Sequence, residues 1–135
     1  MKSEKDNRAY KKLKVYQLSH ELSVRVHKMS LNLPKFEMFE EGSQIRRSSK
    51  SVSNNIVEGY VLRKYKREYI HYLYRALASS VETIEHLDYL YETGSLQDKH
   101  SYESLLEAYK KLGSMLYKYI RAIEKGHESD LVGNV

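Results

Sequence analysis

Two clusters of basic residues have the composition needed to bind phosphate groups. The first opens a serine-rich stretch, RRSSKSVSNNIVEG, and consists of Arg46, Arg47 and Lys50. The second is the pentapeptide RKYKR, and its cations are Arg63, Lys64, Lys66 and Arg67. Guanidinium and ammonium groups neutralise nucleic-acid phosphates, and the tyrosine within RKYKR could stack on a base. Either cluster could equally be a solvated surface that only aids solubility.

The stretch that contains the first cluster carries small polar side chains at helical spacing. One side of this helix would face inward, and its residues are Ile45, Ser49, Val52 and Ile56. A polar row would follow a second side, and its residues are Arg47, Ser51, Asn54 and Glu58. Such a row can be buried only if its members bond one another, which favours a structural role for Arg47. Spacing alone leaves Arg46 and Lys50 open between a structural role and phosphate binding.

The amino-terminal segment adds further cations ahead of both clusters. They are Lys2, Lys5, Arg8, Lys11, Lys12 and Lys14. Basic arms of this kind often bind nucleic acid, and many are only disordered. Residues 1–12 are therefore predicted to form a flexible basic arm, and residues 126–135 a flexible tail.

Residues that could catalyse a reaction or hold a metal are sparse. Glu68 and His71 form one Glu-x-x-His step, whereas di-iron bundles need two such steps and two further glutamates. The other match, Glu124 and His127, spans Gly126 beyond the last predicted helix. The chain has no cysteine, no glycine-rich phosphate loop and no serine paired with a base. We expect no catalytic residue, no metal and no cofactor.

Four stretches carry apolar residues at three- and four-residue steps, which predicts the helices that position these clusters. They are expected at about 14–33, 37–58, 65–92 and 98–125. The stops between and after them are Pro34, Gly59, Thr93-Gly94-Ser95 and Gly126. The inner face of the third helix is expected to carry Ile70, Leu73, Leu77, Val81, Ile84, Leu87 and Tyr91. These helices predict an all-α fold, an antiparallel up-down-up-down four-helix bundle over residues 13–125.

Charge is unevenly distributed along the chain of 135 residues. Its formal net charge is +5, but residues 1–80 hold 17 Lys/Arg against 8 Asp/Glu, and residues 81–135 hold 6 against 10. This asymmetry indicates a basic surface that faces an anionic partner. The absence of cysteine, of a membrane-spanning apolar run and of an apolar signal core leads us to expect a cytoplasmic protein that does not enter a membrane.

Three segments together resemble a known protein family. LKVYQLSHEL, QIRRSSKSVSNNIVEGY and RKYKREYIHYLYRALASSVETIEHLDYLYETG are similar to the 23S rRNA-intervening sequence proteins, over about residues 10–125. The specific combination is a Val-aromatic-Gln start, a Gln-x-Arg-Arg step and an Asn-Ile-x-Glu-Gly helix end. The matching positions are Val15, Tyr16, Gln17, Gln44, Arg46, Arg47, Ser51, Asn55, Glu58, Gly59, Arg63, Tyr65, Tyr69 and Leu73.

The resemblance implies a left-handed bundle that assembles as a homopentamer around a central channel. A related branch, the accessory variability proteins of diversity-generating retroelements, binds nucleic acid and a reverse transcriptase. One side of the second helix would then meet the next subunit through a structural network of Gln44, Arg47, Ser51, Asn55, Glu58 and Gly59. Nucleic acid would be bound by Arg46, Lys50, Arg63, Lys64, Lys66 and Arg67.

The chain departs from the family pattern at a few positions. Tyr16 stands where tryptophan is common, and serines 48 and 49 replace alanines. Val61 and Leu62 stand where relatives often have Gly-Arg, so this connection loses one cation. We expect a non-enzymatic oligomer that binds RNA or an RNA–DNA hybrid through its phosphates. The alternative is a scaffold that docks an acidic protein partner without nucleic acid.

Overall fold

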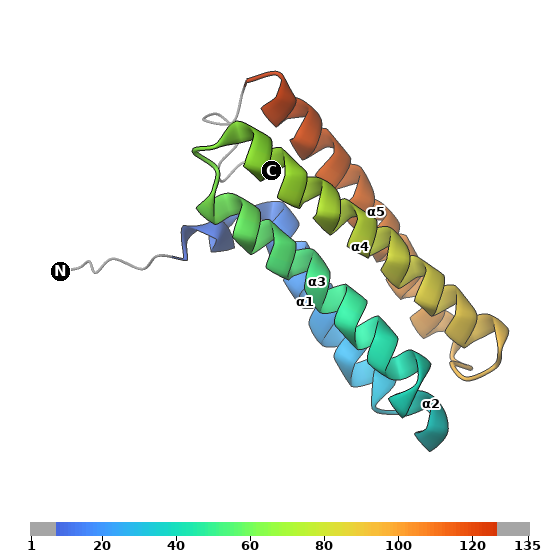
Figure 1. The fold of residues 1–135 in the computed structure, drawn as a ribbon. Coiled ribbons are helices and arrows are strands. Elements are labelled where there is room, and N and C mark those ends of the chain that lie inside the picture. The colour runs from blue at the N-terminus through green and yellow to red at the C-terminus, as the bar shows by residue number, and fades with distance from the viewer. Residues whose placement is uncertain (1–7, 127–135) are drawn as a thin grey trace.

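Residues 8–126 are described by the computed structural model, and most of them lie in helices packed side by side (Figure 1). In chain order the elements are the 3-10 helix η1 (Ala9–Lys12) and the α-helices α1 (Lys14–Ser30), α2 (Lys35–Phe39), α3 (Glu41–Val61), α4 (Lys66–Glu92) and α5 (Lys99–Glu124). This range contains no strand. The four long helices alternate in direction, with α3 packed on α1 and α4, and α5 packed on α4 and α1. The predicted all-α four-helix bundle is confirmed.

The predicted second helix, 37–58, is two helices. The backbone breaks at Glu40, whose φ of −97° and ψ of −98° are not helical, and this residue separates α2 from α3. At its far end α3 continues past Gly59 to Val61 and stops at Leu62. Gly59 is therefore no helix stop but a buried position inside α3.

The predicted flexible arm, residues 1–12, is wrong for its last four residues. These form η1, and the Tyr10 ring packs edge-on against Tyr16 at 5.0 Å and against Tyr60 at 6.5 Å between centroids. The chain is thus fixed to α1 and α3 before the bundle begins. Residues 1–7 of the predicted arm and 127–135 of the predicted tail lie outside the described residues.

The first helix also ends earlier than predicted. α1 stops at Ser30 instead of residue 33. The amides of Leu31 and Leu33 donate to the carbonyls of Lys28 and Ser30, both at 3.3 Å, so the chain tightens into i→i+3 turns before Pro34. The third and fourth predicted helices agree with α4 and α5 to within one residue at each end.

The buried face of α4 differs from the predicted apolar face at several positions, and most at Val81. Val81, expected inside, is 59% exposed. The predicted residues Ile70, Leu77, Ile84 and Tyr91 are half-buried. The buried residues follow alternating steps of four and three and are Tyr69, Leu73, Ala76, Ser80, Thr83, Leu87 and Leu90. Thr83 is inside because its hydroxyl shares a 2.9 Å hydrogen bond with Ser48 of α3. A satisfied polar pair therefore replaces an apolar contact in the centre of the bundle.

Small residues let α3 and α4 approach closely along their length. The hydroxyls of Ser51 and Ser79 are hydrogen-bonded at 2.9 Å. Near the end of α3, a Cβ atom on Gly59 would lie 3.0 Å from the Tyr72 Cβ and 3.1 Å from the Tyr69 ring. The serine-rich composition of α3 is explained by this packing. No helix within residues 8–126 is both long and apolar enough to cross a membrane.

Candidate phosphate-binding surface

Exposed cations from separate parts of the chain gather at one end of the bundle, which we call the basic end. The start of α1, the α3–α4 connection and the end of α5 meet there, at the upper end in Figure 1. The Lys66 ammonium donates to the carbonyl of Glu124 at 3.1 Å, which ties α4 to α5. The cations of the basic end are Arg8, Lys11, Lys12, Lys14, Arg63, Lys64, Lys66, Arg67, Arg121 and Lys125. Its carboxylates are Glu58, Glu68 and Glu124.

The second cluster combines fixed and open cations around aromatic rings. The Arg63 guanidinium lies 4.0 Å from the centroid of the Tyr60 ring and donates to the Tyr60 carbonyl at 2.9 Å. These contacts hold Arg63 in place while it stays exposed to solvent. Tyr65 is 58% exposed, and the Lys64 ammonium lies 5.9 Å from its ring centroid. This end of the molecule can therefore offer both charge and a stacking surface to a polyanion.

The first cluster does not join the second. Arg46 and Arg63 are 17 residues apart on and just beyond one helix, which corresponds to about 25 Å along its axis. Lys50 is exposed, with its ammonium 3.3 Å from the His27 Nδ1 of α1. Of the six residues assigned to nucleic acid, the structure brings together only the four between positions 63 and 67.

Arg46 makes internal contacts instead of facing solvent. Its Nη1 donates to the Ser30 hydroxyl at 2.8 Å, and its Nη2 donates to the Met38 carbonyl at 3.0 Å. The side chain is half-buried and joins α3 to α1 and α2. Arg47, for which the sequence favoured a structural role, is exposed on the single chain. Arg46, which the sequence left open, thus has a structural role within the chain, whereas the predicted subunit-interface role of Arg47 stays a prediction.

The contacts of Arg46 predict that its replacement lowers the stability of the fold and leaves nucleic-acid binding unchanged. We expect Arg46→Met to lower the free energy of unfolding by about 1.5–3 kcal/mol, because charged hydrogen bonds to two partners are lost. Urea denaturation followed by circular dichroism measures this change. Lys110→Met, at an exposed side chain of α5, is the matched control and should stay within about 0.5 kcal/mol of wild type. Equal stability of the two variants would contradict the anchoring role.

The residues assigned to the structural network divide into two groups. Asn55 donates to the Ser51 carbonyl at 2.8 Å and to its hydroxyl at 3.0 Å, and Gly59 is buried one turn further along. These three face α4 of the same chain. The other members are exposed, and they are Gln44, Arg47 and Glu58.

The opposite end of the bundle, which we call the acidic end, carries most of the carboxylates within residues 8–126. They are Glu37, Glu40, Glu41, Glu82, Glu85, Asp88, Glu92, Asp98 and Glu103. His86 joins two of the elements there, because its Nδ1 contacts a Glu41 oxygen and its Nε2 lies 3.3 Å from a Glu82 oxygen. Within residues 8–126, no group of three histidine or acidic side chains is placed to hold a metal ion.

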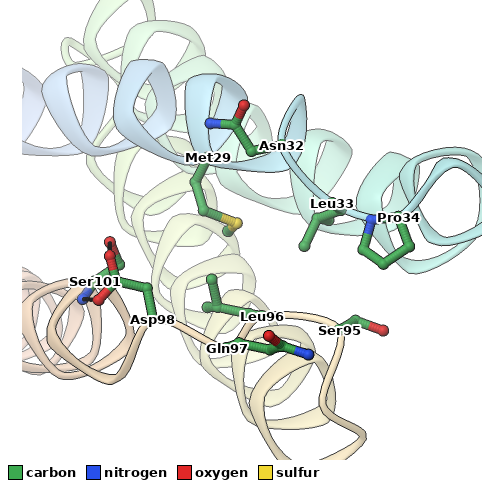
Figure 2. Close-up of a pocket in the computed structure, with 9 residues that line it drawn as sticks. All are labelled: Met29, Asn32, Leu33, Pro34, Ser95, Leu96, Gln97, Asp98 and Ser101. Carbon is green, nitrogen blue, oxygen red and sulfur yellow. Dashed lines mark hydrogen bonds between the residues drawn. The ribbon is translucent and has the colours of Figure 1, made fainter.

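A cavity of about 500 Å³ opens at the acidic end between the α1–α2 and α4–α5 connections (Figure 2). Met29, Leu33 and Leu96 form its apolar lining, with amide and hydroxyl side chains around them. Asp98, on its rim, caps α5 by accepting from the amides of residues 100 and 101. Hydrogen bonds from Ser101 hold the pKa of the Asp98 carboxyl below its usual value. The carboxylate is thus used to stabilise the helix.

The chain is similar in sequence and in fold to known proteins. The 23S rRNA-intervening sequence protein family matches residues 11–118. A similar solved structure is a protein of unknown function from the S23 ribosomal protein family of Bacteroides thetaiotaomicron, with 27% identity and a TM-score of 0.70. The match covers 79% of this chain and 98% of that one. No curated protein gave a match. The chain therefore belongs to the 23S rRNA-intervening sequence protein family.

Proposed function

We propose that the protein is a non-enzymatic, oligomeric nucleic-acid-binding protein that holds RNA or an RNA–DNA hybrid at its basic end. The observation that carries this proposal is that η1, the α3–α4 connection and the end of α5 lie at one end of the bundle (Figure 1), and that each carries exposed cations. Cations that are distant in sequence but adjacent in space act together on a polyanion. Contacts to phosphate carry no base information, so binding would be largely independent of sequence.

Assembly into a homopentamer is part of the same proposal and rests on the family resemblance. Exposed side chains along the bundle give a second subunit something to contact. Gln44, Arg47 and Glu58 are exposed on α3, and Val24 and Val81 are exposed apolar residues on α1 and α4. Native mass spectrometry should give five times the mass of the 15.9 kDa chain. Several basic ends in one particle would raise the affinity for a polyanion through multivalency.

A charge-removing variant tests the basic end. We expect Lys11→Gln, Lys12→Gln, Lys64→Gln and Arg67→Gln together to weaken binding at least about tenfold at 0.1 M salt. The slope of log affinity against log salt should become shallower by up to about four, because each phosphate contact contributes about 0.9. Fluorescence anisotropy with a labelled RNA hairpin and an RNA–DNA hybrid, over a salt series, measures both quantities.

The matched control removes the same charge elsewhere. Lys28→Gln, Lys99→Gln, Lys110→Gln and Lys111→Gln together leave the basic end intact, so affinity should fall far less. Equal losses in the two variants would mean that net charge alone decides binding. Failure of the wild-type protein to bind either probe at low salt would refute the nucleic-acid proposal. The basic end would then fit the alternative function, docking of an acidic protein partner.

A further inference from the structure

The short helix α2 displays two phenylalanines to solvent. Phe36 is 67% exposed and Phe39 is 66% exposed. Leu31, in the preceding turn, is exposed as well. We call Leu31, Phe36 and Phe39 the phenylalanine ridge, and it lies at the acidic end (Figure 1). Large aromatic side chains are usually buried, so an exposed pair on one helix indicates an interaction site.

Side-chain contacts hold α2 in place although the helix has only five residues. Isolated helices of this length do not form in water. Arg46 donates to the Met38 carbonyl, and the Ser95 hydroxyl donates to Glu37 Oε2 at 2.6 Å. The other carboxylate oxygen of Glu37 accepts from the backbone amide of Glu41 at 3.3 Å. Side chains of α3 and of the α4–α5 connection therefore fix α2 in place.

Gly42 adds a further constraint on the position of α2. A Cβ atom there would lie 2.9 Å from the Glu37 carbonyl oxygen, so only glycine allows this approach of α3 to α2. A simple connection between α1 and α3 would need none of these contacts. They stabilise a helix whose two aromatic side chains remain outside the core, which is the pre-organisation expected of a binding surface.

The charge around the phenylalanine ridge selects the kind of partner. Glu40 lies next to Phe39 and is exposed, and α2 belongs to the acidic end with its further carboxylates. Lys35 is the cation nearest to it in sequence. Such a surface attracts a basic partner and repels an anionic membrane. The cavity beside it, whose lining residues Leu33 and Pro34 run directly into α2, has room for an apolar side chain.

We propose that the phenylalanine ridge and the adjoining cavity form a docking site for a basic, amphipathic segment of a partner protein. Phe36 and Phe39 are the apolar anchors, and the carboxylates of the acidic end pair with the basic side chains of the partner. This site lies at the opposite end of the bundle from the proposed nucleic-acid surface. Each proposal can therefore be refuted without affecting the other, and one molecule can bind both ligands at once.

The test uses a synthetic amphipathic helix of leucine and lysine as the probe. We expect it to bind the wild-type protein, with an affinity that falls as salt rises. Phe36→Ser with Phe39→Ser should lower this affinity by about tenfold or more, because anchor residues carry most of the binding free energy. Val61→Ser with Tyr65→Ser, at similarly exposed positions of the basic end, is the matched control and should leave peptide affinity unchanged.

The variant is expected to stay folded because both side chains lie outside the core, and circular dichroism checks this. Equal peptide affinity of the Phe36/Phe39 variant and the control, or no binding to the wild type, would overturn the proposal. A lower oligomeric mass of the Phe36/Phe39 variant would show that the ridge contacts a second copy of the chain instead. Binding of wild type to phosphatidylserine vesicles, lost in the variant, would identify a membrane surface and equally overturn it.

Discussion

Replacing Gly59 by valine is expected to lower the free energy of unfolding by about 3 kcal/mol, at the upper part of the usual range for overpacking. A Cβ atom there already meets the Tyr72 Cβ at 3.0 Å and the Tyr69 ring at 3.1 Å. Two further methyl groups would push α4 away from α3 and disturb the hydroxyl pairs along that contact. Equilibrium urea denaturation measures the loss.

Gly113 of α5 supplies the control for this prediction. The nearest atom to a Cβ built there is the Leu77 Cδ1, at an ordinary distance of 3.9 Å. Gly113→Ala should therefore raise the free energy of unfolding by about 0.5–1 kcal/mol through helix propensity. A lower free energy of unfolding for Gly59→Val and a higher one for Gly113→Ala would distinguish the two effects. The first reports on close helix packing, and the second reports on backbone entropy. A Gly59→Val protein as stable as wild type would show that α3 and α4 can separate freely.

The second large effect is a loss of stability at alkaline pH. Burial raises the pKa of the Tyr69 phenol, with the nearby Tyr119 adding to the rise, and burial also raises the pKa of the Tyr109 phenol. Both phenols stay neutral in the folded protein, whereas in the unfolded chain they ionise near pH 10. Above that pH the unfolded state binds fewer protons, so stability falls. Two phenols over two pH units correspond to roughly 5 kcal/mol.

A Tyr109→Phe variant distinguishes the contribution of this buried phenol to the alkaline loss of stability from the contributions of other titrating groups. The Tyr109 hydroxyl is buried, and within residues 8–126 it has no hydrogen-bond partner. Tyr109→Phe should therefore cost nothing at pH 7. Above pH 10 its stability should fall less steeply than that of wild type, by about 1.4 kcal/mol per pH unit. Tyr89→Phe, at an exposed side chain, should leave the wild-type slope unchanged, and identical slopes for all three proteins would refute the prediction.

The fold could be predicted because three of the long helices keep an apolar stripe along most of their length. The inner residues of α3, Ile45, Ser49, Val52 and Ile56, are all buried. Val81 was misplaced because apolar character was taken as the sign of burial. In the centre of α4, Ser80 and Thr83 occupy the inner face instead. Their burial depends on hydrogen bonds, and the Thr83 partner lies on another helix, which spacing along one helix cannot show.

The candidate site was predicted only in part. The cations between positions 63 and 67 could be found because they are contiguous in sequence. The environments of Arg46 and Arg47 could not be predicted, because the Met38 carbonyl that Arg46 binds belongs to α2, a helix that the sequence did not separate from α3. The break at Glu40 carries no glycine or proline. It depends on the close approach of Gly42 to the backbone of α2, which only the folded chain defines.

The segregation of charge between the two ends gives the molecule a dipole along its long axis. Under the proposed function, such a molecule would approach a nucleic acid with its basic end first and would bind upright instead of lying along the strand. Four helices packed about 10 Å apart present an end roughly 20 Å across, which corresponds to about six base pairs of duplex. Each chain would occupy a short segment of nucleic acid, and α2 would stand at the far tip, about 40 Å away.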